Sequence, residues 1–496
     1  MIRVNNIHLS LDYDDKSVRK AVAQQLRIEE KSIKSCKIFR RSVDARKKDN
    51  IYFLTTVDTE LNINEDKVCK KCGNAQIARK YEYNQMKFGN APSPVIVGAG
   101  PAGLFAALIL ARSGANPILI ERGRDVDRRT ADVNRFWTSG QLDTTSNVQF
   151  GEGGAGTFSD GKLNSGTKDI RQRKVLEEFV SHGAPDEILY NAKPHIGTDM
   201  LKGTIKNIRN EIIELGGRVM FETKLVSMAF SDNKLKSITV ETANGNEIIE
   251  TDNVILAIGH SARDTFEMLY DLKLPIEAKP FSVGARIEHL REKVDKAQYG
   301  RFAGNKKLGS ANYKLSTHLD NGRGVYTFCM CPGGKVVNAS SEKNRLCTNG
   351  MSEFARNAEN SNSALLVGIN PDDYESDHPL AGMYLQRKLE SKAFVAGGEN
   401  YNAPIQRVDD FLNNRKSTHL GDVKPSIGPN YEFSNLNEIL PEYVCTSMAQ
   451  GIVKMGRMLH GFDDGDAVLT GVESRSSSPV RIMRKTDTWL YITKVS

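Results

Sequence analysis

The sequence predicts an α/β protein in which a Rossmann-like domain is interrupted by an inserted α+β domain and preceded by a small N-terminal α+β module. The first observation is the stretch "VIVGAGPAGLFAALIL" at 95–110, a strand, a glycine-rich turn and a helix. The second is a further buried strand, "VILAIG" at 254–259, that follows only after a long interruption. The third is the length of 496 residues, more than one hydrophobic core usually serves.

The apolar stretch at 95–110 has two competing interpretations. A spanning helix needs roughly 20 apolar residues, and this stretch is shorter and carries Gly98, Gly100, Pro101 and Gly103 in its first half. Those residues favour a tight turn between "PVIV" and the helix "LFAALILARSG". We therefore expect a nucleotide-binding turn and no membrane span.

Each residue of the turn has a physical role in holding a diphosphate. Gly98 permits the sharp turn, Gly100 lets the backbone approach the phosphates, and Gly103 lets the helix pack closely on the strand. Pro101 and Ala102 begin the helix, whose N–H groups concentrate positive charge at that end. A second strand, "NPILIER", ends at Glu121, roughly 20 residues further on, where a carboxylate accepts the hydroxyls of an adenosine ribose. Glu121 disfavours a 2′-phosphate, although Arg122 weakens that exclusion; the alternative is an exposed acid in a turn.

The order of the next elements separates FAD from NAD. The segment "FGEGGAGTFSDGKLNSG" at 150–166, a helix at 198–215 and a meander with an "NG" turn at 244–245 come before the strand that ends at Gly259. This interruption is typical of two-domain FAD oxidoreductases rather than simple NAD dehydrogenases. The expected cofactor contacts in the interrupting segments are Gly153, Gly154, Ser159, Gly161, Lys162 and, for adenine, the backbone of Val226. The alternatives are a surface loop at 150–166 and an ordinary core strand at 254–259.

The N-terminal module, residues 1–90, carries a basic stretch and a pair of cysteines. The basic residues Arg40, Arg41, Arg46, Lys47 and Lys48 lie between two predicted strands and indicate a solvated hairpin tip rather than an RNA or acidic-partner site. Cys69 and Cys72 form a CxxC, but zinc needs four ligands and no second pair is suitably spaced, so we expect no metal. Asp15 is the expected N-cap of the helix that starts there.

The inserted domain, residues 275–455, holds the candidate catalytic groups. "KPFSVGARIEH" places Arg286 and Glu288 on one side of a strand and His289 on the other. Arg286 is a candidate for binding a substrate carboxylate, and His289 or His260 for moving protons, with structural duty as the alternative for each. Cys331 is a candidate thiol facing the flavin, and buried packing of Cys329 and Cys331 on one strand face is the alternative.

Several long motifs extend beyond these local patterns: "QFGEGGAGTFSDGKLN", "AIGHSARDTFEML", "KPFSVGARIEH", "FCMCPGGKVVNAS", "TNGMSEFARN" and "TGVESRSSSPVRIMR". They resemble a family of FAD-dependent dehydrogenases from bacteria and plastids whose substrate is unassigned. The resemblance implies an FAD domain at 91–274, resumed at 456–496, around the inserted domain. Family members continue into a "GLYPCGEGAGYAGG"-like turn that this sequence lacks, so we expect a truncated or frameshifted reading frame and impaired FAD binding.

The predicted function is an FAD-dependent oxidoreductase that passes a hydride between noncovalent FAD and a small molecule. No second GxGxxG that joins a predicted strand to a helix occurs, so NAD(P)H would bind only transiently. The net charge of +7 is too dilute to indicate nucleic acid, and seven scattered cysteines without a secretion signal favour a cytoplasmic protein. Two alternatives stay open: a non-catalytic FAD-fold protein that binds RNA or protein through its basic module, and an NAD-linked dehydrogenase. The oligomeric state is not predicted.

Overall fold

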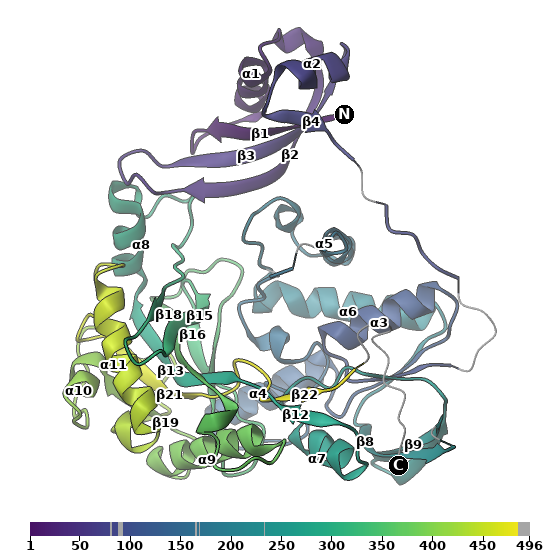
Figure 1. Ribbon diagram of the computed structural model, residues 1–496, viewed down its shortest axis with the longest axis vertical. Helices are drawn as coiled ribbons and strands as arrows, with labels where there is room; N and C mark the ends of the chain where they lie inside the picture. The colour runs from purple at the N-terminus through teal and green to yellow at the C-terminus, as the bar shows by residue number, and fades with distance from the viewer. Residues whose placement is uncertain (80–81, 88–92, 164–165, 168, 233, 485–496) are drawn as a thin grey trace.

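The computed structural model describes residues 1–79, 82–87, 93–163, 166–167, 169–232 and 234–484. Figure 1 shows the N-terminal module above two larger parts, with the nucleotide-binding part on the right and the inserted part on the left. The predicted fold class is confirmed: a parallel Rossmann-type sheet is interrupted by a large α+β insertion. No helix among the described residues has the length and apolar character needed to cross a membrane.

The N-terminal module is a four-stranded sheet with two helices on it. The sheet order is β2-β3-β1-β4, and the elements are β1 (Ile2–Leu9), α1 (Asp15–Leu26), β2 (Ile33–Asp44), β3 (Tyr52–Leu61), α2 (Glu65–Lys71) and β4 (Ala75–Ile77). Val18, Val22 and Leu26 of α1 are buried, as the helical spacing predicts. The N-cap is Asp14 and not Asp15, because the Asp14 side chain accepts the backbone N–H of Ser17.

The nucleotide-binding part contains a parallel sheet of order β11-β5-β6-β7. Its elements are β5 (Val95–Val97), α3 (Pro101–Arg112), β6 (Ile118–Ile120), α4 (Val126–Ser139), α5 (Gln172–Ser181), α6 (Thr198–Glu214), β7 (Arg218–Met220), β11 (Val254–Leu256) and α7 (Arg263–Asp271). β11 pairs in parallel with β5, so the strand predicted after the interruption does return to the first sheet. The sheet and α3 form one apolar core with α6, which includes Ile96, Ala107 and Ile208.

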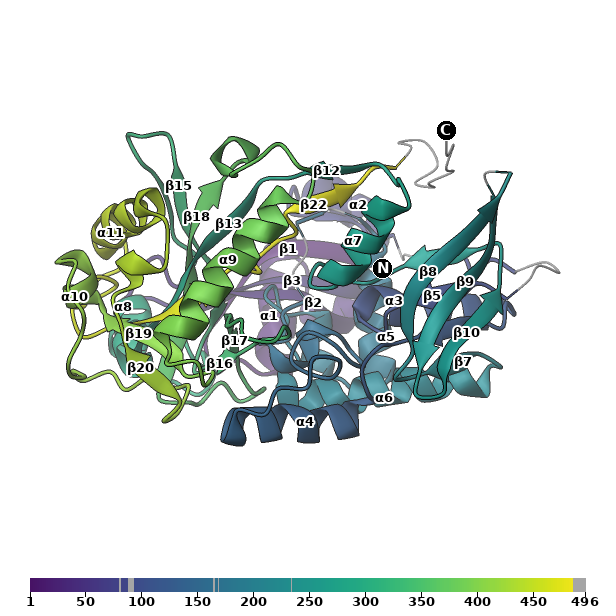
Figure 2. The same ribbon diagram turned by 90° about the horizontal axis from the view of Figure 1, so that it is seen from below.

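The predicted meander is a separate antiparallel sheet of order β10-β9-β8, formed by β8 (Lys224–Ser231), β9 (Lys234–Thr242) and β10 (Gly245–Glu250). Gly245 has a φ of +104°, which the predicted "NG" turn requires. Figure 2 shows this sheet beside the parallel strands, on the side away from the inserted part.

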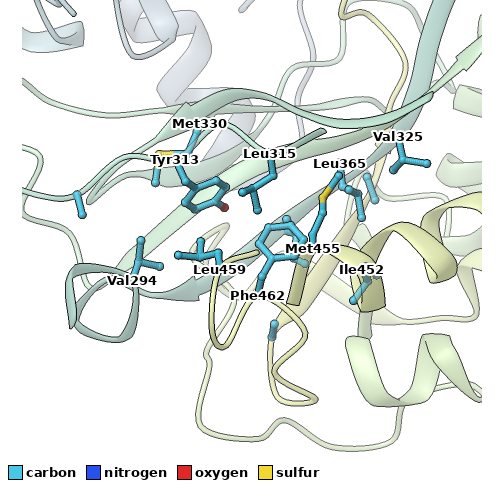
Figure 3. Packing of buried hydrophobic residues seen from close by; sticks show 14 of the residues in the cluster. Val294, Tyr313, Leu315, Val325, Met330, Leu365, Ile452, Met455, Leu459 and Phe462 are labelled. Carbon is cyan, nitrogen blue, oxygen red and sulfur yellow. The ribbon is translucent and has the colours of Figure 1, made fainter. Parts of the chain in front are cut away.

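The inserted part is built on a seven-stranded sheet of order β14-β15-β18-β13-β21-β19-β20. Its strands are β13 (Phe281–Leu290), β14 (Ser316–His318), β15 (Gly324–Cys331), β18 (Asn360–Ile369), β19 (Ala403–Arg407), β20 (Tyr431–Phe433) and β21 (Val468–Glu473). The hairpin β16 (Lys335–Asn338) and β17 (Thr348–Met351) lies on one face, and the helices of this part are α8 (Arg291–Tyr299), α9 (Ala381–Ala396), α10 (Val408–Leu412) and α11 (Glu442–Gly456). Alternate residues of β13, including Val283 and Ile287, face the core beneath α11. Figure 3 shows that core, where Tyr313, Leu315 and Leu365 pack near Met455 and Phe462.

The C-terminal boundary of the insertion differs from the predicted residue 455. β21 lies between β13 and β19 in the seven-stranded sheet, so residues 468–473 belong to the inserted part. The chain then returns through β22 (Val480–Ile482), which pairs with β12 (Ile276–Ala278). The short 3-10 helices are Glu30–Ser32, Ala155–Phe158, Asp186–Leu189, Gly300–Phe302, Pro371–Asp373 and Leu436–Glu438. The C-terminal "TWLYITKVS" and the start of the predicted hinge at 91–94 lie outside the described residues.

Candidate functional site

The first glycine-rich turn connects β5 to α3 in the way the sequence predicts. Gly98 has a φ of +104°, and a Cβ built on Gly103 would lie 1.8 Å from the Gly98 carbonyl oxygen. Gly100 is the N-cap of α3, and no side chain of the described residues caps that end. Pro101 and Ala102 are exposed there. The α3 N-terminus therefore presents backbone N–H groups to an anion, and this geometry fits a diphosphate.

Glu121 is the buried centre of this turn. Its carboxylate accepts backbone N–H groups from Ala99 at 2.8 Å, Gly123 at 2.9 Å and Gly151 at 2.9 Å. The side chain is 6% exposed, so the alternative of an exposed turn acid is wrong. Glu121 thus ties the first glycine turn to the second glycine-rich segment.

The second glycine-rich segment lies directly against the first. A Cβ built on Gly154 would lie 3.1 Å from the Gly100 Cα, and Gly153 and Gly154 have φ values of +84° and +62°. Both segments line one cavity of about 610 Å³, whose other walls are apolar residues of α3, α5 and α6. The polar residues on its edge include Ser159 and Lys162. The alternative of a solvated surface loop does not describe residues 150–163, all of which are buried or half-buried.

Arg129 of α4 holds the second glycine-rich segment in place, and sequence reasoning missed it. Its guanidinium is fully buried and donates to the carbonyls of Asn147 at 2.8 Å, Val148 at 3.0 Å and Glu152 at 2.6 Å. Burial lowers the pKa of Arg129 to about 10, which still leaves it charged at neutral pH. No local pattern distinguishes it from Arg128 beside it, which lies on the helix surface.

Ser159 lines this cavity, whereas Arg122, Val226 and Gly259 are not among its lining residues. Arg122 stacks over Phe150 at 4.4 Å and forms a fork with Asp264 at 2.9 and 3.2 Å, so its guanidinium is already engaged. Gly259 follows β11 with a φ of +67°, and Val226 lies at a register shift of β8. The Ser159 hydroxyl donates to the Gly156 carbonyl at 3.0 Å.

Two of the candidate catalytic residues are structural in their contacts. Arg286 is fully buried, and its guanidinium donates to Asn362 and to the Cys329 carbonyl, while Glu473 lies 3.5 Å away. β17 covers it so closely that a Cβ on Gly350 would lie 2.2 Å from Arg286 Nη2. The prediction of a cavity arginine is therefore corrected, because no open space adjoins the guanidinium. His289 faces the core, where Nε2 contacts the Phe462 carbonyl at 2.9 Å.

His260 and Cys331 differ in their surroundings. Burial, together with Arg475 and Arg263, lowers the pKa of His260 to about 4, so the ring is neutral at physiological pH. Its Nδ1 has no hydrogen-bond partner among the described residues. Cys331 is fully buried at the end of β15, beside Cys329, which is partly exposed.

The N-terminal module meets the rest of the chain through part of its basic stretch. Arg41 donates to Asn191 at 2.8 Å and to Tyr13 at 3.0 Å, and Arg46 pairs with Asp44. The hairpin tip reaches the inserted part, where Arg301 donates to the Asp49 carbonyl at 2.7 Å (Figure 1). Within the described ranges no group of three or more His, Cys, Asp or Glu side chains forms a metal-binding cluster, and Cys69 and Cys72 are half-buried thiols.

Comparisons with known proteins assign families to these parts. Residues 93–132 match an FAD binding domain, residues 280–476 match the C-terminal domain-like region of an FAD-dependent protein, and residues 1–60 match a domain of unknown function. An uncharacterized protein of Clostridium beijerinckii is 47% identical over 489 residues, which cover 97% of this chain and 91% of that protein.

Solved structures show weaker likeness. The flavin-dependent brominase Bmp2 is 14% identical with a TM-score of 0.31, over 59% of this chain and 61% of that one. A flavoprotein/dehydrogenase from Cytophaga hutchinsonii is 14% identical with a TM-score of 0.29, over 57% and 58%. The glycerol-3-phosphate dehydrogenase from Bacillus halodurans, complexed with FAD, is 12% identical with a TM-score of 0.30, over 56% and 48%. The chain spans about half to three fifths of the length of these structures.

The matched domains, together with the uncapped α3 N-terminus and the paired glycine segments, define a flavoprotein whose cofactor is FAD. The chain belongs to the family of the clostridial protein, and its own regions match an FAD binding domain and the C-terminal domain-like region of an FAD-dependent protein. The expectation of FAD is thereby confirmed, and the matches give no support to the RNA-binding or protein-binding alternative.

Proposed function

We propose that the protein is an FAD-dependent oxidoreductase that passes a hydride between noncovalent FAD and a small organic molecule. The observation that carries the proposal is the convergence of both glycine-rich segments on one cavity of about 610 Å³ at the uncapped N-terminus of α3. Bound FAD would supply the hydride chemistry, and the chain supplies position and electrostatics.

The roles of the chain's own groups follow from the geometry. The amides at Ala102 and Gly103 would bind the diphosphate, and Glu121 would accept a ribose hydroxyl. Gly154 would let the second segment approach the cofactor without a side chain between them. Lys162, in an ion pair with Asp160 at 2.9 Å, would place a positive charge on the edge of the same cavity. His260 is neutral at physiological pH, and because its pKa is lowered it would accept a proton only weakly.

NAD(P)H, where it serves as reductant, would bind transiently, since among the described residues only the GxGxxG at 98–103 joins a strand to an α-helix. We keep the divisions at residues 90 and 274 as proposed domain boundaries. A cytoplasmic location is proposed because all seven cysteines are unbridged thiols.

The test is to purify the full chain with added FAD and measure absorbance in the blue after gel filtration. Retained flavin that is bleached by an added hydride donor supports the proposal. A colourless protein that instead binds adenine nucleotide only at millimolar NAD would favour an NAD-linked dehydrogenase and refute it.

A further inference from the structure

The end of β15 departs from regular strand geometry at two cysteines. Cys329 has a φ of +46°, in the left-handed region, and the ladder between β15 and β18 loses register between Phe328 and Cys331. A non-glycine residue there stores strain, and bulges of this kind re-aim side chains next to active sites. In a regular strand, Cα atoms two residues apart are about 6.6 Å apart, close to the upper limit of about 6.8 Å for a disulfide.

The two sulfurs share one local network. Cys331 Sγ donates to the Cys329 carbonyl at 3.3 Å, and Arg286 Nη2 lies 2.9 Å from that carbonyl and 3.7 Å from Cys331 Sγ. A hydrogen bond from Cys331, reinforced by the charges of Lys162 and Arg286, holds the pKa of Cys329 well below its usual range. The same hydrogen bond, with burial, raises the pKa of Cys331. These opposite shifts favour deprotonation of Cys329 over that of Cys331.

The positions of the two residues assign them different roles. Cys331 is fully buried, whereas Cys329 is partly exposed, so Cys329 is the one of the two that a reagent is expected to reach first. Lys162, whose charge acts on both sulfurs, also lines the cavity between the two glycine-rich segments. The cavity proposed for FAD and the thiol pair therefore have one side chain in common.

We propose that Cys329 and Cys331 are a redox-active dithiol that exchanges an electron pair with the flavin. This inference rests on the proposed function, because the flavin is the oxidant. The Cys329 thiolate and the Cys331 thiol form one S–S bond and together release two electrons and the Cys331 proton. The oxidised flavin takes up both electrons and that proton and becomes the anionic reduced flavin. The reverse step opens the disulfide with electrons from reduced flavin.

The other cysteines provide matched controls within the same chain. Cys347 is 1% exposed, donates to the Ala339 carbonyl, and has its pKa raised by burial to about 12. Cys445 is likewise buried, and burial raises its pKa to about 12. Cys347→Ser therefore removes a buried thiol of ordinary character and leaves the pair intact.

The first experiment is an anaerobic reductive titration of the FAD-bound full chain. The wild type and Cys347→Ser are expected to take up four electrons per protein, two for the flavin and two for the disulfide. Cys331→Ser and Cys331→Ala are expected to take up two. A wild type that takes up only two electrons, with its flavin fully bleached, would overturn the dithiol.

The second experiment locates the bond and the thiolate without relying on the flavin. After equilibration with oxidised dithiothreitol, peptide mass mapping should find Cys329 and Cys331 joined within one peptide. Iodoacetamide should alkylate reduced Cys329 rapidly below pH 7, and Lys162→Met should shift that profile to higher pH. The ionisable groups that act on the pair are Lys162, Asp160, Arg286, Glu473 and Tyr313. Alkylation of Cys329 only above its ordinary pKa, or a disulfide to another cysteine, contradicts the inference.

The failures of the two proposals are distinguishable. A protein that never retains FAD refutes the flavin chemistry itself. A yellow protein that takes up two electrons and shows no bond between Cys329 and Cys331 refutes only the dithiol.

Discussion

Replacing Gly100 with valine should weaken FAD binding strongly while leaving the protein folded. Gly100 has a φ of −71°, which any residue adopts, and the nearest atom to a Cβ built on it is the Gly154 Cα at 3.9 Å. That is ordinary contact, so we expect the free energy of unfolding to change by no more than about 1 kcal/mol. The added side chain instead projects to where the diphosphate must approach the amides of α3.

The expected loss of affinity follows from those amides. One charge-assisted hydrogen bond contributes about 1.5–3 kcal/mol, so displacing the diphosphate from a single N–H weakens FAD binding about 10-fold to 100-fold. Fluorescence titration of FAD onto apoprotein measures the dissociation constant, and thermal unfolding of the same samples measures stability.

The matched control is Gly103→Ala. A Cβ at Gly103 would lie 1.8 Å from the Gly98 carbonyl oxygen and 3.4 Å from the Ala257 side chain. This overlap should destabilise the fold by about 1–3 kcal/mol or more, so the smaller substitution has the larger effect on stability. If Gly100→Val keeps wild-type FAD affinity, the diphosphate does not bind at the α3 N-terminus and the reasoning fails.

Three further predictions concern buried groups. Glu121→Ala leaves three backbone N–H groups without their acceptor and should destabilise the protein by about 3 kcal/mol or more, measured by urea unfolding against the exposed control Glu222→Ala. Burial lowers the pKa of His260 to about 4, below its value in the unfolded chain. The stability that the neutral ring contributes is therefore present above about pH 6.5 and is lost as the pH falls towards 4. His260→Gln should flatten that part of the pH–stability curve, and an unchanged slope would contradict the prediction. Arg286→Met leaves Glu473 buried without its cation and should destabilise by about 3–5 kcal/mol, increasingly as the pH rises past about 7, where Glu473 loses its proton; adding Glu473→Gln should restore much of the loss.

Local patterns in the sequence predicted the elements of the cofactor site correctly. The βα turn at Gly98–Gly103, the meander turn at Gly245 and the return of the strand at 254–256 are all local features, because turn chemistry and strand periodicity depend on neighbouring residues. The position of Glu121 also followed, since a fixed spacing separates it from the turn.

Contacts between residues far apart in the sequence determine the surroundings of Arg286 and Cys329, which local patterns did not predict. Arg286 is closed off by Gly350 on β17, far along the chain, and no spacing around Arg286 indicates that cover. Cys329 was expected on a regular strand face together with Cys331, but its left-handed backbone depends on how β15 and β18 lose register. The difference in burial between the two thiols, with Cys329 partly exposed and Cys331 buried, accompanies that distortion.

The second glycine-rich segment contacts both the nucleotide-binding part and the inserted part. At its start, Gly151 donates to Glu121, and Arg129 binds the carbonyls around it. At its end, the fully buried Asp160 receives hydrogen bonds from Ser352 and Arg356 of the inserted part. Burial alone would raise the pKa of the Asp160 carboxyl group. The cationic side chains of Lys162 and Arg356 outweigh that effect and hold the pKa below its ordinary range. Because Ser159, Gly161 and Lys162 beside Asp160 line the cavity, we expect cofactor binding and docking of the inserted part to be thermodynamically linked.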